Sequence, residues 1–444
     1  MAATSFDAET HRRRRDRFLA EIGGGVAILV ALPELVKSRD TDIRYRPDSD
    51  LVYLTGFAEP GAVAVLTPHD DAHRLTLFVR ERNPEREAWD GPRAGPDGAR
   101  ELTGADAAYP LKELDERLRD LLAPADAIVY ALGADAAMDA RVTELLRGFR
   151  RTRPRTGKGP AAVRDPATVL DRMRLIKEPA ELELIRASAE ISARAHTAAM
   201  RAARPGIGEW ELEALVDATF RAAGPAAGNA FNTIVGSGVN GTVLHYVDNA
   251  RRTEDGDLVL IDAGAALGLY CSDITRTFPV SGRFTAAQRR VYEIVLAAEE
   301  AAIEAVRPGA PFTAIHEAAR AVLVQGMIDL GLVTGTVEEV IEARAHQRFF
   351  MHQTSHFLGL DVHDVGAYTQ PDGSPTTLQP GMVLTVEPGL YIPAADDVPE
   401  PLRGIGIRVE DDVIVTGDGG EVITRAIPVA PDEIEALVGS GGLR

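Results

Sequence analysis

Five residues in the C-terminal part of this chain have side chains that bind metal ions well. Four are carboxylates and one is an imidazole, and each carboxylate lies at or near a short apolar run typical of a strand. Oxygen-rich ligand sets suit hard divalent ions such as manganese. Five ligands are also enough to hold two ions, the arrangement that activates a water for hydrolysis. These candidate ligands are Asp262, Asp273, His356, Glu387 and Glu410.

The carboxylates belong to a faint internal repeat. The segment DGDLVLIDAG, which contains Asp262, recurs as PGMVLTVEPG, which contains Glu387. A second carboxylate follows on the next expected strand of each copy, Asp273 in SDITRTF and Glu410 in RVEDDVIV. Four carboxylates that converge from two half-domains repel each other strongly unless cations lie between them. The repeat therefore predicts a metal site at the centre of the second domain.

Histidines gather near the same segments. MHQTSHFLGLDVHDVG contains His352, His356 and His363, and NTIVGSGVNGTVLHY contains His245. His356 is the best ligand candidate, and the other three suit hydrogen bonding or proton transfer near the metals. A satisfied structural role remains the alternative for each of those three. The glycine-rich GSGVNG lacks the Gly-Lys-Ser/Thr ending of a phosphate loop, so we interpret it as a tight loop that brings His245 to the pocket.

Composition limits the classes of function. The 444 residues are 45% hydrophobic and 26% charged, as in a soluble globular protein. The net charge of −19 argues against nucleic acid as a partner. No apolar run reaches the roughly 18 residues of a membrane helix. Cys271 is the single cysteine, so no internal disulfide can form, and we interpret it as a small buried residue in a cytoplasmic protein.

The pattern of elements predicts two domains. Short apolar runs alternate with helical stretches between Gly25 and Gly133, which indicates an α/β domain in residues 1–165. The segment 150–166 is rich in Arg, Pro and Gly and is interpreted as a linker. A helical pattern over 167–203 breaks before Pro179, which suits the first turn of a new helix. Residues 166–444 would form the second domain.

Several motifs resemble those of a known superfamily. HFLGLDVHD, LIDAG with SDITRTFP, MVLTVEPGLY and GIGIRVEDD are similar to the metal-binding segments of the pita-bread metallopeptidases, which include methionine aminopeptidase, prolidase and Xaa-Pro aminopeptidase. YRPDSDLVYLTGFAEP resembles the N-terminal domain of Xaa-Pro aminopeptidase, also called aminopeptidase P. The resemblance covers nearly the whole chain. It implies an α/β (α+β) protein in which an N-terminal α/β domain precedes a pita-bread catalytic domain with an internal pseudo-twofold repeat.

The resemblance also implies how two divalent ions, which we expect to be manganese, are held. Asp262 and Asp273 would bind one ion, and His356 and Glu387 the other. Asp273 and Glu410 would bridge the pair. A water or hydroxide between the ions would be the nucleophile, because two cations lower its pKa.

Further roles follow from the same resemblance. Glu387 would also accept the proton of the water, and His363 would stabilise the developing oxyanion. His245 would position the substrate, and His352 would line the pocket for proline. Arg408 matches an arginine that is linked to the metal-site carboxylates, and its plausible task is to orient Asp262 or a neighbouring carboxylate.

The N-terminal domain would contribute to specificity. Trp89, in REAWDGPRAG, resembles a tryptophan that reaches the active site of a neighbouring subunit, and ordinary packing is the alternative. Arg153 or Arg155 could reach across in the same way. The resemblance suggests a homodimer or homotetramer whose substrates are peptides with proline at the second position.

Two hydrolytic functions and one non-hydrolytic class compete. An Xaa-Pro aminopeptidase removes the first residue when proline follows it, whereas a prolidase hydrolyses only Xaa-Pro dipeptides. The upstream motif and the overall spacing favour the aminopeptidase. Methionine aminopeptidase is disfavoured, because that enzyme does not need an N-terminal domain such as the first 165 or so residues of this chain. Relatives that degrade creatine or only bind proteins lack the full ligand set that this sequence contains.

Overall fold

The computed structural model describes residues 6–441 and divides the chain into two compact units, the first ending at Met173 and the second beginning at Arg174. The sequence predicts the boundary after residue 165. The structural division lies later because most of helix α7 (Ala167–Leu175) belongs to the N-terminal unit. There the Tyr53 hydroxyl donates a hydrogen bond of 3.2 Å to the carbonyl of Met173.

The N-terminal unit is built on a six-stranded mixed sheet with the order β6-β5-β4-β1-β7-β8. The strands of this unit are β1 (Val26–Val30), β2 (Val36–Ser38), β3 (Thr41–Asp42), β4 (Val63–Leu66), β5 (Leu75–Val79), β6 (Ala107–Pro110), β7 (Ala127–Val129) and β8 (Ala162–Arg164). Its other helices are α1 (Ala8–Ile22), α2 (Ser49–Thr55), α3 (Pro84–Asp90), α4 (Gly95–Thr103), the 3-10 helix η1 (Leu111–Glu113), α5 (Leu114–Leu122) and α6 (Ala136–Thr156).

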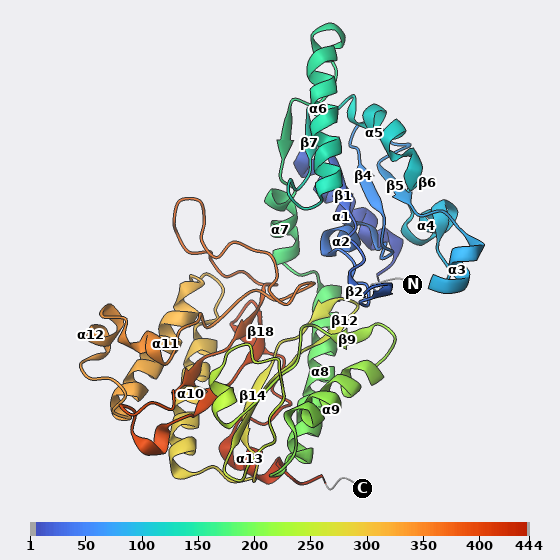
Figure 1. Ribbon diagram of the computed structural model, residues 1–444. Helices are drawn as coiled ribbons and strands as arrows, with labels where there is room; N and C mark the ends of the chain where they lie inside the picture. Colours follow the sequence, from blue (N-terminus) through green and yellow to red (C-terminus); the bar gives the residue numbers. More distant parts are fainter. Residues whose placement is uncertain (1–5, 442–444) are drawn as a thin grey trace. The chain divides into compact units, whose positions relative to one another are not determined.

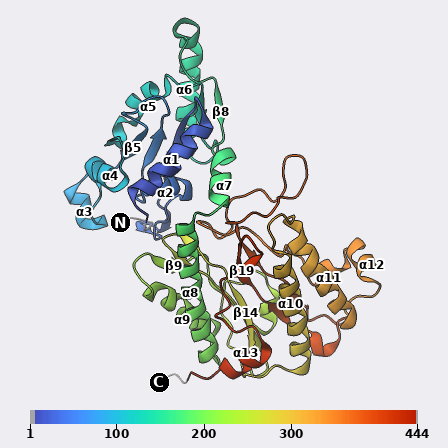
Figure 2. The same ribbon diagram turned by 180° about the vertical axis from the view of Figure 1, so that it is seen from behind.

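Helices cover both faces of this sheet, which explains why its central strands are continuous apolar runs. Helices α5 and α6 pack on one face through Leu118 and Val142, against Ile28 and Val65 of the strands. Figure 1 shows α6 in front of the sheet, and Figure 2, seen from behind, shows α1 on the opposite side.

The predicted linker at 150–166 is largely ordered structure. Helix α6 continues to Thr156 with Pro154 inside it, and β8 then pairs with β7. A proline within a helix costs about 3 kcal/mol, and tertiary contacts offset that cost here. Phe149 is buried in the core of the unit, and Arg153 donates a hydrogen bond of 3.1 Å to the carbonyl of Pro160.

The C-terminal unit consists of helix pairs and short strands. Its helices are α8 (Pro179–Ala202), α9 (Glu209–Ala222), η2 (Gly238–Thr242), α10 (Ala286–Ala305), α11 (Thr313–Asp329), α12 (Val337–Glu342), η3 (Ala345–Arg348), η4 (Glu400–Leu402) and α13 (Pro431–Leu437). Its strands are β9 (Ala227–Asn229), β10 (Ile234–Ser237), β11 (Leu258–Asp262), β12 (Ala265–Leu267), β13 (Tyr270–Cys271), β14 (Thr275–Pro279), β15 (Val383–Val386), β16 (Gly389–Tyr391), β17 (Gly406–Arg408), β18 (Asp411–Val415) and β19 (Gly420–Val422).

The element order of this unit occurs twice. Helices α8 and α9 precede an antiparallel pair, β11 with β14, and helices α10 and α11 precede a second antiparallel pair, β15 with β18. The strands lie between the two helix pairs in both views (Figures 1 and 2). One continuous apolar core joins both halves, with Ile261 and Val386 among its members. The repeat that the sequence indicates therefore has a counterpart in the order of the elements.

Local signals fix the ends of the helices that flank the strands. Helix α8 begins with Pro179 in its first turn and a capping box between Glu178 and Glu181, as the sequence break predicts. Helix α10 begins with a capping box between Thr285 and Gln288. Within residues 6–441, none of the helices combines the length and the apolar character that crossing a membrane requires.

Candidate metal centre and substrate pocket

The four carboxylates come from equivalent places in the two halves of the C-terminal unit. Asp262 ends β11 and Glu387 directly follows β15, whereas Asp273 precedes β14 and Glu410 precedes β18. The antiparallel registers align Asp262 with Thr275 and so bring the carboxylates of each half to one end of their strand pair. The two halves share one core, so these ends meet.

One imidazole joins the carboxylates. Ligand atoms of Asp273, His356 and Glu410 all lie within 4.8 Å of one another. The Nε2 atom of His356 is 3.4 Å from Oδ2 of Asp273 and 3.7 Å from Oε1 of Glu387. Spacings of this size leave room for an ion between the atoms, because metal–ligand distances are about 2.0–2.2 Å.

The backbone sets the orientation of the His356 ring. Its amide donates to the Thr385 hydroxyl at 3.2 Å, and its carbonyl accepts from the Thr385 amide at 3.0 Å, which ties this loop to β15. The ring Nδ1 is 3.1 Å from the carbonyl of Phe357, where a proton on Nδ1 would donate. The Nε2 lone pair is then free to face the carboxylates, as in many metal sites.

Buried negative charge makes the carboxylates hard to ionise without a cation. Burial, followed by repulsion from Asp262, Asp412 and Glu387, raises the pKa of Asp273 well above its ordinary value. Burial, followed by repulsion from Asp273 and Glu387, likewise raises the pKa of Glu410 well above its ordinary value. Burial also raises the pKa of Glu387. A divalent cation reverses this balance, because it favours the ionised form of every carboxylate around it.

The donor set fits divalent metal ions in a further respect. Within residues 6–441, Oδ1 of Asp262 is a buried oxygen without a hydrogen-bond donor, whereas Oδ2 of the same group accepts from Arg408. A buried carboxylate oxygen without a hydrogen-bond donor needs another partner, and a metal ion held among the neighbouring carboxylates would provide one. Four carboxylates and one imidazole without a thiolate form a hard ligand set.

Arg408 organises the group from behind. It donates to Asp262 through Nη2, to the Thr275 hydroxyl at 2.9 Å through Nε, and to the Tyr391 hydroxyl at 3.0 Å through Nη1. The Thr275 hydroxyl in turn donates to Oε2 of Glu410 at 2.7 Å. Burial would lower the pKa of Arg408, but Tyr391 and the surrounding carboxylates outweigh it and raise that pKa well above its ordinary value. The contact that the sequence predicts between Arg408 and Asp262 is present.

The three further histidines line one cavity of about 1140 Å³ together with the carboxylates. His363 lies against His356, with ring centroids 4.4 Å apart. His352 is 2.9 Å from the Tyr391 hydroxyl through Nε2, and burial lowers the pKa of His352 to about 4. Burial, followed by His356, also lowers the pKa of His363. His245 lies on an exposed turn at the wall of the same cavity.

The structure adds residues that the sequence interpretation missed. Both carboxylate oxygens of Asp412 accept from the amide of Asp273 at 3.2 Å, which fixes the backbone of a candidate ligand. The acidic run in RVEDDVIV was the available signal. His316 of α11 also lines the cavity, with Nδ1 2.9 Å from the Thr354 hydroxyl. Its sequence surroundings contain no motif that singles it out.

Three predicted residues of the N-terminal unit lie in helices of that unit. Trp89 is in α3 and its side chain is largely exposed, at 87%. Arg153 and Arg155 lie in the last turns of α6. The predicted reach of these side chains to a neighbouring subunit stays a prediction. Cys271 is buried, as the sequence predicts.

Comparisons with known proteins now identify the class. Residues 183–417 match Metallopeptidase family M24, and residues 11–130 match the Aminopeptidase P N-terminal domain. The chain therefore belongs to metallopeptidase family M24. The fold class that the sequence predicts is confirmed.

Individual members of the family show which enzymes this chain is similar to in sequence and structure. The Xaa-Pro aminopeptidase of Escherichia coli (strain K12) is 44% identical over 429 residues, which cover 96% of this chain and 97% of the relative. The structure of Pseudomonas aeruginosa aminopeptidase PepP matches with a TM-score of 0.94 at 44% identity, over 97% of this chain and 98% of that one. Zinc-substituted E. coli aminopeptidase P in complex with product matches with a TM-score of 0.93 at 44% identity, over 98% of each chain. The predicted resemblance to Xaa-Pro aminopeptidases is confirmed.

Proposed function

We propose that this chain is an Xaa-Pro aminopeptidase that hydrolyses the first peptide bond of peptides with proline at the second position. The observation that carries the proposal is the convergence of Asp273, His356 and Glu410 on one point of a large cavity, with ligand atoms within 4.8 Å of one another. The likeness to the E. coli and P. aeruginosa enzymes over nearly the whole chain supports the same function.

The five predicted ligands hold two divalent metal ions in this proposal. As the resemblance implies, Asp262 and Asp273 would hold one ion and His356 and Glu387 the other, and Asp273 and Glu410 would be shared by both. Manganese is the ion that the oxygen-rich ligand set favours, since zinc prefers nitrogen and sulfur ligands. When bound, the pair of ions supplies a water-derived nucleophile at neutral pH by lowering the pKa of water.

The remaining side chains handle protons and position the substrate. Glu387 would accept the proton of the water that attacks the peptide bond. His363, which lies against His356, donates a hydrogen bond to the oxygen on which negative charge develops. His245 would position the substrate near the scissile bond, and His352, whose Nε2 is 2.9 Å from the Tyr391 hydroxyl, would line the pocket for proline.

Proline explains why a dedicated pocket is required. Proline has no amide N–H and its φ angle is fixed near −65°, so a pocket that relies on that N–H cannot accept it. Apolar rings suit the pyrrolidine, and Phe350 packs against His352 with ring centroids 5.0 Å apart. The cavity of about 1140 Å³ extends along α11 past His316 and Arg320, which suits substrates longer than a dipeptide. This extension favours an aminopeptidase over a prolidase.

Assembly and location complete the proposal. We expect a cytoplasmic homodimer or homotetramer in which Trp89 borders the active site of a neighbouring subunit. The Trp89 side chain is exposed and is therefore accessible for the proposed contact between copies. Neither nucleic acid nor a membrane is expected as a partner.

Matched peptides test the proposal. With manganese added, an Xaa-Pro-Yaa tripeptide should release its first residue quickly, whereas the Xaa-Pro dipeptide and the Xaa-Ala-Yaa tripeptide should react slowly or not at all. Cleavage of the dipeptide alone would make the protein a prolidase. Equal cleavage of the alanine and proline tripeptides would remove the proposed proline specificity.

A further inference from the structure

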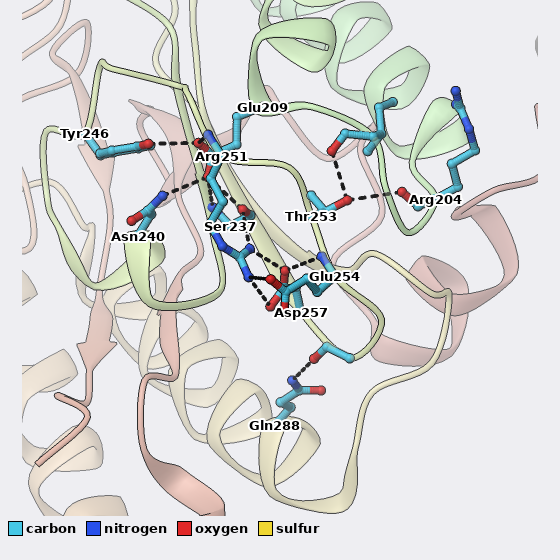
Figure 3. Close-up of polar contacts among 12 residues, drawn as sticks. Arg204, Glu209, Ser237, Asn240, Tyr246, Arg251, Thr253, Glu254, Asp257 and Gln288 are labelled. Atoms are coloured by element: carbon cyan, nitrogen blue, oxygen red, sulfur yellow. Dashed lines mark hydrogen bonds and ion pairs between the residues drawn. The ribbon is translucent and has the colours of Figure 1, made fainter.

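A buried glutamate begins helix α9 and holds the loop that follows β10. Glu209 has 0% exposed surface, and its carboxylate accepts five hydrogen bonds of 2.7–3.1 Å (Figure 3). Oε1 accepts from the amide and hydroxyl of Ser237 and from the side chain of Asn240. Oε2 accepts from the Tyr246 hydroxyl and the Arg251 amide. The donors thus come from the start, the middle and the end of the segment 237–251.

A second anchor tightens the base of this loop. Arg251 donates to the Ser237 hydroxyl at 2.8 Å and forms an ion pair with Asp257, as Figure 3 shows. Gly238 has a positive φ of 55°, and a Cβ atom there would lie 2.7 Å from Oδ1 of Asp257. The turn is therefore closed around the ion pair, and only glycine fits it without strain.

The opposite side of the loop touches the strand behind the metal centre. A Cβ atom on Gly406 would lie 2.1 Å from the carbonyl oxygen of Gly241, so the two backbones are in direct contact. Gly406 begins β17, and Arg408 ends it. The loop is held between the anchors at its base and the strand that carries Arg408.

The tip of the loop is part of the substrate pocket. Leu244, His245 and Val247 line the cavity, whereas Tyr246 between them directs its hydroxyl to Glu209. Farther on, the Asn249 side chain bonds the amide of Val235 and the carbonyl of Thr233, both at 2.9 Å. The position of the His245 backbone is therefore determined by contacts that its neighbours make below the pocket.

We propose that Glu209 is a positioning residue that acts through His245: by anchoring the segment 237–251, above all through Tyr246, it fixes the imidazole at the wall of the substrate pocket. This inference rests on the proposed function, in which His245 contacts the substrate. Glu209 itself lies outside the cavity-lining residues and touches none of the five predicted ligands. It should therefore affect the handling of substrate and leave metal binding intact.

The experiment is a double-mutant cycle between Glu209→Gln and His245→Ala. Glutamine keeps the shape but turns one acceptor oxygen into an N–H donor that faces other donors. In the otherwise unchanged enzyme, Glu209→Gln should lower kcat/KM for an Xaa-Pro-Yaa tripeptide about 10-fold or more, because a small misplacement of a substrate-positioning group can cost up to about 10²-fold in rate. In the His245→Ala background it should lower kcat/KM by less than twofold, because the group that it positions is gone. Metal content should stay at its original value throughout.

Two further variants keep the test sharp. Glu211→Gln changes a carboxylate on the same helix that caps Gly208 and lies at the surface, and it should leave kcat/KM unchanged. Tyr246→Phe removes one hydroxyl and should give a smaller loss of kcat/KM that also disappears in the His245→Ala background. This second cycle decides the matter even if Glu209→Gln does not fold.

The outcomes separate the two claims. If Glu209→Gln lowers kcat/KM equally with and without His245, or leaves kcat/KM unchanged, the positioning role of Glu209 is overturned. If His245→Ala alone is still slow in either case, the substrate contact of His245 in the proposed function stands. A fully active His245→Ala would overturn the substrate contact assigned to His245 in the proposed function, and the positioning role with it.

Discussion

Two groups of buried carboxylates in the C-terminal unit differ in how their charge is balanced. Asp364 is almost fully buried and receives 2.6 and 2.9 Å hydrogen bonds from Arg174 and Lys177, which are also buried. Burial would raise the pKa of Asp364, but Lys177 and Arg174 outweigh it and lower that pKa. In the candidate metal centre, by contrast, four carboxylates share Arg408, and burial with mutual repulsion raises the pKa of Asp273.

The contrast shows what distinguishes a structural carboxylate from a ligand. Asp364 and three of the four metal-centre carboxylates are buried and Glu387 is half-buried, so burial alone does not separate the two groups. The difference is the supply of positive charge by the chain itself. Asp364 has two cations of its own, whereas the metal-centre carboxylates have too few and require an external cation to be ionised together.

We expect the largest effect when a carboxylate of the candidate metal centre is removed. Glu387→Ala removes a predicted ligand and the predicted proton acceptor together, so peptide hydrolysis should fall by at least about 10³-fold. Elemental analysis should show loss of bound metal in the same variant. Glu300→Ala, at an exposed position on α10, is the matched control and should keep both metal and activity. An active Glu387→Ala enzyme would remove the assignment.

Breaking the other group should cost stability instead. Asp364→Asn leaves Lys177 buried without its anion and removes one carboxylate partner of Arg174, which keeps Asp361, so the free energy of unfolding should fall by about 3–5 kcal/mol. Metal content should not change. Asp361→Asn removes the more exposed partner of Arg174, with 33% of that side chain exposed, and should cost no more than about 1 kcal/mol. Urea titrations of the two variants measure their free energies of unfolding. Equal losses of stability would show that the number of cations around a carboxylate does not determine its contribution to stability.

His363 and Asp364 are adjacent in the sequence but have different expected roles. His363 directly precedes Asp364 but faces His356 in the cavity. His363→Ala should lower kcat by about 10²–10³-fold, the size of the loss when one oxyanion donor is removed, with both metal ions retained. Steady-state kinetics combined with metal analysis tests this. Release of the ions from the variant would mean that His363 is a ligand.

A buried titratable group can also avoid the cost of burial by staying uncharged. His11 of the N-terminal unit is such a group, and it gives the smallest effect that we expect. Burial lowers the pKa of His11 from 6.5 to about 4. Between these values the unfolded chain binds more protons than the folded one, so stability is complete above pH 6.5 and is lost as the pH falls toward 4. The loss between pH 7 and pH 5 should be about 2 kcal/mol.

His11→Gln isolates this contribution, because glutamine can still donate to the carbonyl of Tyr53 but does not titrate. Urea unfolding at both pH values should show a smaller pH dependence in the variant than in the original protein. An identical pH dependence in both proteins would mean that another group is responsible.

The sequence predicts best what depends on neighbours in the chain. The ligand segments were recognisable because each carboxylate ends or precedes a short apolar run. The start of α8 followed from Pro179 and its capping residues. The ion pair of Lys177 with Asp364 was not predictable, because its partners are 187 positions apart. The end of α6 was missed because packing of Phe149 overrides the local effect of Pro154.

The network of Glu209 illustrates the same limit within the site. Its five donors come from residues 28 to 42 positions later in the sequence, and no local motif connects them. The roles of the individual ligands remain predictions that come from the resemblance. The structure contributes their proximity and the shortage of positive charge around them.

The most direct measurement is anomalous X-ray diffraction from crystals grown with manganese, recorded on both sides of the manganese absorption edge. The proposed ligand assignment predicts two manganese peaks per chain, both in contact with Asp273 and Glu410, with Asp262 at one peak and His356 and Glu387 at the other. A single peak, or manganese bound away from these five residues at full activity, would contradict the proposal that they hold a pair of ions.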